Sequence, residues 1–179
     1  TLNSGTTKAV KVTGSVEDLN GAGDITSVAM KFYTSDLNGG CTNDNNNCYQ
    51  ATCTTQAGEN SNRLDFNCPL TLQFYADSTS AGGPDASKNW VAGILVTDAS
   101  AATGNASSLT KEVGTLLALS IPSTLDFGSL SFNTETSDST NQAMTITQYG
   151  NDEADVEVSM PGAMTCSGTG SIPLANVRW

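Results

Sequence analysis

The sequence predicts an all-β protein made of two tandem antiparallel β-sandwiches, the second of them incomplete. Ser, Thr, Asn and Gly are plentiful and charged residues are only 14% of the chain, a composition typical of short strands joined by polar turns. Apolar residues recur at every second position in several segments. No segment has the apolar spacing of an amphipathic helix, so the strands must bury their apolar faces sheet against sheet.

Residues 1–115 contain the clearest strands, which we expect at 9–16, 26–33, 64–76, 90–98 and 106–113. The segment 64–76 is the most regular, because its apolar side chains alternate without interruption up to Phe74. Pro69 within it indicates a sheet edge or a bulge. The expected core residues are Val10, Val12, Phe32, Leu70, Leu72, Trp90, Ile94 and Val96.

Residues 116–179 predict a second, partial sandwich, with strands at 143–151 and 155–160. This segment offers about four or five strands, whereas a sandwich usually needs about seven in about 100 residues. Two explanations stay open: the remaining strands are missing from this chain, or another segment fills the gap.

The charge balance and the missing histidine exclude several classes of function. With 18 acidic against 7 basic residues and a net charge of −11, the chain repels nucleic acid and anionic membranes and attracts cations. The absence of histidine excludes Ser-His-Asp and Cys-His catalysis and histidine-ligated zinc or haem. No apolar run is long enough to cross a bilayer and no signal peptide is present, so a secreted form is expected to be a mature or trimmed chain.

Four of the five cysteines lie close together, three of them within "CTNDNNNCYQATC" (41–53) and the fourth at Cys68. The spacing forms neither a zinc knuckle nor a redox C-x-x-C pair, and no basic residue lies near to hold a thiolate. In a polar, acidic chain this pattern favours two disulfides formed in an oxidising compartment over a metal site or reduced thiols.

Four cysteines allow three pairings, which the sequence alone does not resolve. We favour Cys41–Cys48, which closes the Asn-rich loop, together with Cys53–Cys68, which ties that loop to a strand. Such bridges order a polar loop that has little core of its own. The fifth cysteine, Cys166, either stays free or pairs with a group outside this chain.

Two stretches resemble known modules. Residues 8–113, with "VTGSVEDLNGAGDITSV" near the start and "NWVAGILVTDASAATGNAS" near the end, resemble Ig-like and PKD-like modules of prokaryotic surface proteins. Residues 120–170, with "LDFGSLSF" and the later "QYGN" at 148–151, are similar to bacterial and archaeal Ig-like repeats. The resemblance implies a repeat-built extracellular protein whose modules act as spacers, adhesins or lattice subunits. In such proteins the second module continues beyond a position like Trp179.

Asp18, Asn20 and Asp24 place oxygen ligands in one turn, and Asp98, at the end of a strand, can join them. Calcium prefers such ligands, so this is a candidate calcium site. The competing interpretation is a turn whose side chains bond their own backbone. Asn105, in the sequon "NAS", is a candidate glycosylation site whose use depends on the host.

Other motifs favour ordinary structural interpretations. The Asn-rich run 43–47 offers calcium only one carboxylate, and "DFG" at 126–128 lacks every other kinase motif. No base is available to activate Ser or Thr. The neighbouring carboxylates Glu17–Asp18 and Asp152–Glu153 sit beside turns and face opposite ways, so they do not form a glycosidase pair. We therefore expect neither an enzyme nor an organic cofactor.

The main hypothesis is a non-catalytic extracellular structural protein, a subunit of a surface layer, stalk or filament. Its expected partners are copies of itself or other surface proteins. Strand donation between subunits would complete the second sandwich, with residues 1–12 as the donor. The alternative is an adhesin or a carbohydrate-binding module that contacts glycans through exposed aromatic residues, for which Tyr33, Tyr49 and Tyr75 are the candidates.

Overall fold

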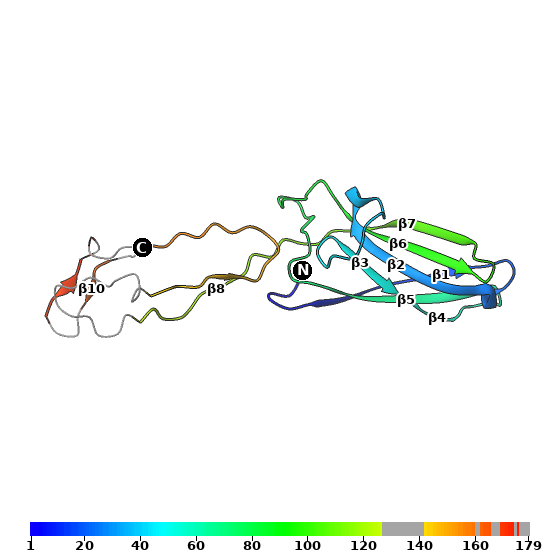
Figure 1. Ribbon diagram of the computed structural model, residues 1–179, viewed down its shortest axis with the longest axis horizontal. Coiled ribbons are helices and arrows are strands. Elements are labelled where there is room, and N and C mark those ends of the chain that lie inside the picture. Colours follow the sequence, from blue (N-terminus) through cyan, green and yellow to red (C-terminus); the bar gives the residue numbers. More distant parts are fainter. Residues whose placement is uncertain (127–141, 160–161, 166–168, 174, 176–179) are drawn as a thin grey trace.

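The computed structural model is all-β, with antiparallel sheets and no α-helix among the residues it describes, which are 1–126, 142–159, 162–165, 169–173 and 175. Its described helices are two short 3₁₀ turns, η1 (Ala22–Asp24) and η2 (Ser35–Leu37), and no described helix is long and apolar enough to span a membrane. Figure 1 shows two sheets at one end of an elongated molecule and a less regular C-terminal part at the other. Cys166 lies outside the described residues.

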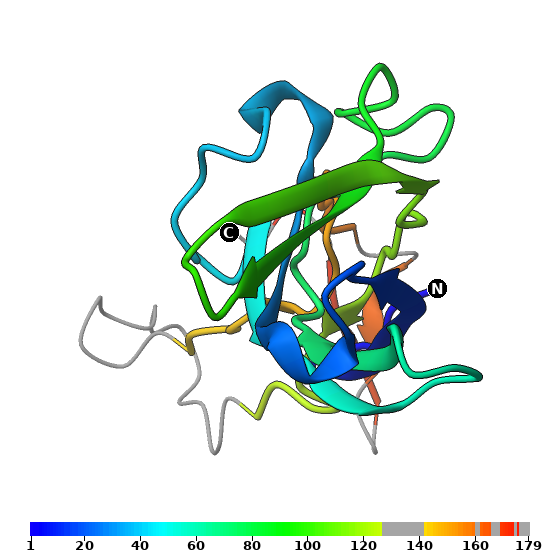
Figure 2. The same cartoon turned by 90° about the vertical axis from the view of Figure 1, so that its right-hand side faces the viewer.

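Seven strands build two sheets from residues 8–111. The four-stranded sheet has the order β3-β2-β6-β7, with β3 at Cys48–Thr52, β2 at Ile25–Thr34, β6 at Trp90–Asp98 and β7 at Thr103–Lys111. The three-stranded sheet has the order β1-β5-β4, with β1 at Lys8–Glu17, β5 at Arg63–Leu72 and β4 at Thr54–Ala57. In Figure 1 the two sheets lie as an upper and a lower layer, and Figure 2 gives the view along the long axis.

One apolar core contains side chains from both sheets. Its members include Val28, Met30, Phe32, Phe66, Cys68, Leu70, Leu72, Trp90 and Ile94. Trp90 is fully buried, stacks on Phe32 with ring centroids 4.9 Å apart, and donates from Nε1 to the backbone oxygen of Asp77 at 2.9 Å. Burial of this large ring with its N–H satisfied makes Trp90 the centre of the core.

The Asn-rich loop covers the outer face of the four-stranded sheet. The Cys41–Cys48 disulfide folds the loop back, and Tyr33, Cys48 and Val91 form a second buried cluster beneath it. Lys31 Nζ donates to the backbone oxygens of Gly39 and Cys41 at 3.1 and 3.0 Å. The loop therefore has a small core of its own as well as its bridge.

The C-terminal part contains only two-residue strands among its described residues: β8 (Leu119–Ser120), β9 (Thr147–Gln148), β10 (Met164–Thr165) and β11 (Ser171–Ile172). β8 pairs with β9, and β10 pairs with β11. Residues 155–159 form no strand, and only Thr147–Gln148 of the predicted strand 143–151 does. The prediction at 143–151 was therefore too long, and the prediction at 155–160 was wrong for its described residues. No described hydrophobic side chain after Val113 is buried, so no core holds such strands.

In the N-terminal part the predicted strands differ from the observed ones mainly at their ends. The strand predicted at 64–76 ends at Leu72, because Gln73 and Ala76 close a turn in which the Ala76 N–H donates to the Gln73 oxygen. Pro69 lies beyond the part of β5 that pairs with β4, which stops at Asn67. The expectation of a local sheet edge at Pro69 is confirmed, since proline is tolerated where a neighbouring strand has ended.

Candidate functional site

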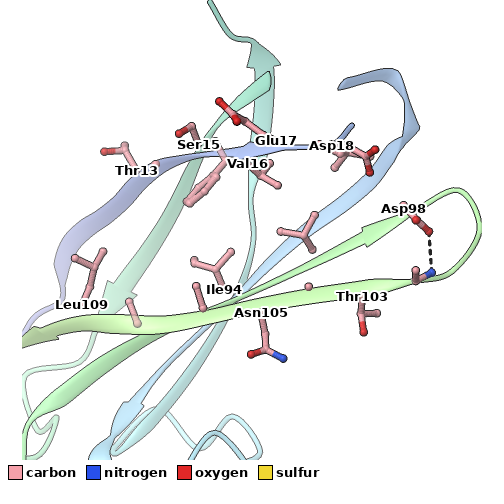
Figure 3. Close-up of a pocket in the computed structure, with 18 residues that line it drawn as sticks. Thr13, Ser15, Val16, Glu17, Asp18, Ile94, Asp98, Thr103, Asn105 and Leu109 are labelled. Atoms are coloured by element: carbon pink, nitrogen blue, oxygen red, sulfur yellow. Dashed lines mark hydrogen bonds between the residues drawn. The ribbon is translucent and has the colours of Figure 1, made fainter. Parts of the chain in front are cut away.

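The two sheets meet differently at their two sides. On one side the chain passes directly from β3 to β4 through Cys53, whose disulfide to Cys68 joins this crossing to β5. On the other side β1 and β7 are edge strands, and a groove of about 450 Å³ lies between them. We call the second the open side. Figure 3 shows Val16, Ile94 and Leu109 pointing into it.

The groove exists because small residues occupy core-facing positions on the two edge strands. On β7 the positions opposite Val96 and Ile94 are Gly104 and Ala106. On β1, Gly14 leaves room for Phe66, whose ring would lie only 2.7 Å from a Cβ at that position. Leu109 faces the core, since it pairs with the buried Ala92, yet it is 54% exposed. The groove is thus an apolar surface left uncovered by this chain's own side chains.

Three of the predicted calcium ligands come together at one end of the groove. Carboxylate oxygens of Asp18, Asp24 and Asp98 all lie within 4.8 Å of one another, and all three residues are half-buried. The β1–β2 turn and the β6–β7 turn are held together here, because the Ala99 N–H donates to the Asp24 backbone oxygen at 2.8 Å. The fourth predicted ligand, Asn20, is exposed, and its backbone N–H donates to Asp18 Oδ1 at 2.7 Å.

Local hydrogen bonds already occupy the carboxylate oxygens of Asp98, one member of this cluster. Ser100 Oγ donates to both carboxylate oxygens of Asp98, and the Ala102 N–H donates to Asp98 Oδ1 at 2.7 Å. The Ser100 hydrogen bond is the main reason why the pKa of Asp98 is lowered, and the backbone N–H of Ala102 adds to it. A carboxylate kept ionised in this way suits either a hard cation or a self-bonded turn, so both sequence interpretations fit the geometry.

A calcium titration tests the prediction that Asp18, Asp24 and Asp98 hold this ion. We expect about 1 mM calcium, in the range that extracellular modules bind, to raise the midpoint of thermal unfolding. The variant Asp24→Asn should remove the increase, whereas Asp126→Asn, outside the cluster, should keep it. An equal increase in both variants would show that calcium acts elsewhere on this acidic chain.

The Asn-rich run 43–47 uses its single carboxylate to cap its own backbone. Asp44 Oδ1 accepts hydrogen bonds from the backbone N–H groups of Asn46, Asn47 and Cys48 at 2.9–3.0 Å. Burial acts to raise the pKa of Asp44, but these donors outweigh it and the pKa is lowered. Asp44 therefore orders the disulfide loop, which explains the run without a cation.

Asn105 lies on β7, and its side chain is exposed. Figure 3 shows this side chain pointing away from the groove. The sequon is therefore accessible on the outer face of the four-stranded sheet, as the sequence prediction requires, although Asn105 sits within a strand.

The aromatic candidates for glycan contact do not form a patch. Tyr33 and Tyr49 are buried, and only Tyr75 is exposed, at 42%. The Tyr49 hydroxyl donates to the Asn45 oxygen at 2.6 Å and accepts from the Gln73 N–H, and burial raises its pKa to about 12. Tyr49 thus links the Asn-rich loop to the end of β5, which is a structural role.

A junction that the sequence did not predict joins the N-terminal sheets to the C-terminal part. Asn151 Nδ2 donates to the backbone oxygens of Ala76 and Gly114 at 2.8 and 3.2 Å, and its Oδ1 accepts from the Leu116 N–H at 2.7 Å. A Cβ on Gly150 would fall on the Leu116 backbone oxygen. The Tyr149 oxygen accepts from the Gly5 N–H at 3.2 Å. The only sequence signal for this junction is the "QYGN" motif at 148–151, which resembles Ig-like repeats.

The proposed donor segment is used within its own chain. Lys8–Val12 of β1 pair with Leu72–Cys68 of β5, and Leu2 is buried in the same core. Donation to a neighbour would therefore require residues 1–12 to leave β5 and the core, and the segment is not the free end that the sequence led us to expect.

The chain was compared with protein families, curated proteins and solved structures. No family model, curated protein or solved structure matches the chain. The structure has two disulfides in an all-β, antiparallel fold. Disulfides of this kind are typical of an oxidising, extracellular environment.

Proposed function

We propose that the chain is a non-catalytic structural subunit of an extracellular assembly, a surface layer, stalk or filament. In this proposal, residues 1–115 form an Ig-like β-sandwich module and residues 116–179 form part of a second one. The module would be rigidly joined to the second through Tyr149–Asn151, as a load-carrying spacer requires.

One observation carries the proposal: the C-terminal part presents apolar side chains in strand-like alternation, and its described residues form no core to receive them. Leu117, Leu119 and Ile121 are 63%, 45% and 62% exposed, and Val156 and Val158 are also exposed. Soluble proteins rarely leave contiguous apolar surface uncovered unless a partner covers it. A strand supplied by a neighbouring copy would pair with these segments and bury their exposed apolar side chains.

Assembly of the full chain tests the proposal. We expect ordered polymers in negative-stain electron microscopy, and we expect Leu119→Asp and Ile121→Asp to abolish them, because each places a charge in the surface that the neighbour buries. Leu19→Asp is the matched control, since Leu19 is 95% exposed in the β1–β2 turn, away from these side chains. Polymers that survive both C-terminal substitutions, or a wild-type chain that stays monomeric, would refute the proposal.

The adhesin alternative has one supporting observation. A polar hollow lies on the outer face of the three-stranded sheet, lined by residues that include Thr13, Ser15, Gln56, Asp65 and Asn67. Hydroxyl and amide side chains of this kind can bond sugar hydroxyls, but without an aromatic platform the hollow lacks the apolar surface on which a sugar ring packs. A monomer that binds a glycan array, and loses binding in Gln56→Ala, would favour this alternative.

A further inference from the structure

The open side carries two strand edges that nothing in the described chain covers. β1 pairs only with β5, and β7 pairs only with β6. A free edge presents unpaired N–H and C=O groups on which another strand can add. Between the two edges lies the apolar groove into which Leu109 and Val16 point (Figure 3). Hydrogen-bonding capacity and apolar surface thus coincide at this side.

Basic residues that form no ion pair with a described residue also lie on the open side. Of the seven basic residues, Lys31 bonds to loop carbonyls, Arg63 pairs with Asp65, Lys88 pairs with Asp36 and Asp85, and Arg178 lies outside the described residues. The other three, Lys8, Lys11 and Lys111, have no ion pair with a described residue, and all lie on the edge strands of the open side.

Along these edges the charges are separated by sign. Lys8 and Lys11 begin β1 and Lys111 ends β7, so the three cations lie at one end of the open side. At this end the two edge strands themselves carry three lysines and no acidic residue, and Glu112 follows directly after β7. At the other end lie four carboxylates, Glu17, Asp18, Asp24 and Asp98. Arg63 of β5 lies opposite Glu17, but it is paired with Asp65 and Glu59. Eight or nine residues of extended strand separate the two ends, about 25–30 Å, which exceeds the screening length at physiological salt.

We propose that the open side binds the open side of a second copy, with the two β1 edges antiparallel about a twofold axis. This orientation faces the basic end of each copy with the acidic end of the other, whereas placing like ends together would oppose acid to acid. Lys11 and Glu17 are both on the outer face of β1, since they are six residues apart. Pairing about Gly14 then sets each Lys11 opposite the Glu17 of the other copy.

This contact differs from the one that builds the proposed assembly. It involves β1 and β7, not the exposed apolar side chains at 117–121 and 156–158, so it does not depend on how the C-terminal part is completed. The competing interpretation is that the lysines protect the edge strands from pairing with other chains, since lysines on an edge strand often have this effect. The two interpretations predict opposite effects of changing the charges.

The test is the dimerisation constant of the full chain, measured by sedimentation equilibrium. All variants carry Leu119→Asp to block polymers and Cys166→Ser to prevent intermolecular disulfides, and a chelator removes cations from the Asp18 cluster. We expect a dimer that Lys11→Glu and Glu17→Lys each weaken about tenfold, since each reversal opposes like charges at two symmetric contacts. The double variant K11E/E17K should restore the original constant.

Net charge provides the decisive control. Glu17→Lys makes the chain two charges less acidic than its net −11, so a general repulsion between copies would strengthen the dimer, opposite to our expectation. Glu157→Lys makes the same change of charge at an exposed position of the C-terminal part, farther along the chain from the Asn151 junction, and should leave dimerisation unchanged. A monomeric parent, a dimer indifferent to both reversals, or a double variant as weak as the singles would overturn the proposal. Folding of each variant is checked by its thermal unfolding midpoint.

Discussion

Removing the Cys53–Cys68 disulfide is expected to lower the free energy of unfolding by about 3 kcal/mol, the loop-closure value for a bridge of this span. The two cysteines are 15 residues apart, and both belong to the main core. Cys53 lies where the chain crosses from β3 to β4. The bridge joins this crossing to β5, which is the central strand of the three-stranded sheet. Urea denaturation of the variant C53A/C68A, followed by tryptophan fluorescence, measures the change.

The second disulfide is the matched control for the first. Cys41–Cys48 spans only 7 residues and holds the loop over the outer cluster around Tyr33. Its removal in C41A/C48A should cost less, about 2 kcal/mol by the same relation. If C41A/C48A were the more damaging variant, the outer loop and not the crossing would be the more important constraint, and our ranking would be wrong.

Replacing Asn151 by alanine is expected to cost about 3 kcal/mol and to free the C-terminal part from the N-terminal sheets. The substitution removes three hydrogen bonds and leaves half-buried backbone groups of Ala76, Gly114 and Leu116 without this partner, at about 1 kcal/mol or more each. Limited proteolysis should then cleave near residue 116 much faster than in the parent chain. Urea denaturation gives the loss of stability.

Glycine substitutions test the same junction without touching a hydrogen-bonding side chain. Gly150→Ala forces a methyl group onto the Leu116 backbone and should reproduce the faster cleavage. Gly114→Ala lies nearby, but a Cβ there meets nothing within 4 Å, so this variant should behave like the parent. Equal cleavage of both glycine variants would mean that close packing at Gly150 does not hold the junction.

The sequence was most informative where one face of a strand is buried. The alternation in β1, β2, β5 and β6 reflects residues such as Val28, Met30 and Leu70, whose burial imposes a period of two. The sequence did not indicate β3, because Cys48 and Tyr49 are neighbours buried in different clusters and so do not alternate with polar residues. It did not indicate β4 because "TTQA" is polar and exposed. Of the two, β4 is held by backbone pairing to β5, which leaves no periodic signal.

The candidate sites were predictable to a similar degree. Asp18 and Asp24 are close in sequence and share one turn, so their convergence with Asp98 followed from the strand order at one end of the sheets. The junction at Asn151 was not predictable, since its partners are backbone groups 35 to 75 residues away. The open side depends on small residues such as Gly14 and Gly104, and a glycine in a strand does not indicate by itself whether a neighbour fills its space.

The elongated shape has a consequence for growth. The C-terminal part extends from the end of the sheets opposite the Asp18 and Asp98 turns (Figure 1). An antiparallel pair of N-terminal sheets would therefore point its two C-terminal parts in opposite directions. A filament that alternates such pairs with contacts between C-terminal parts would have no polarity: its two tips would be identical, and subunits would add to both at the same rate.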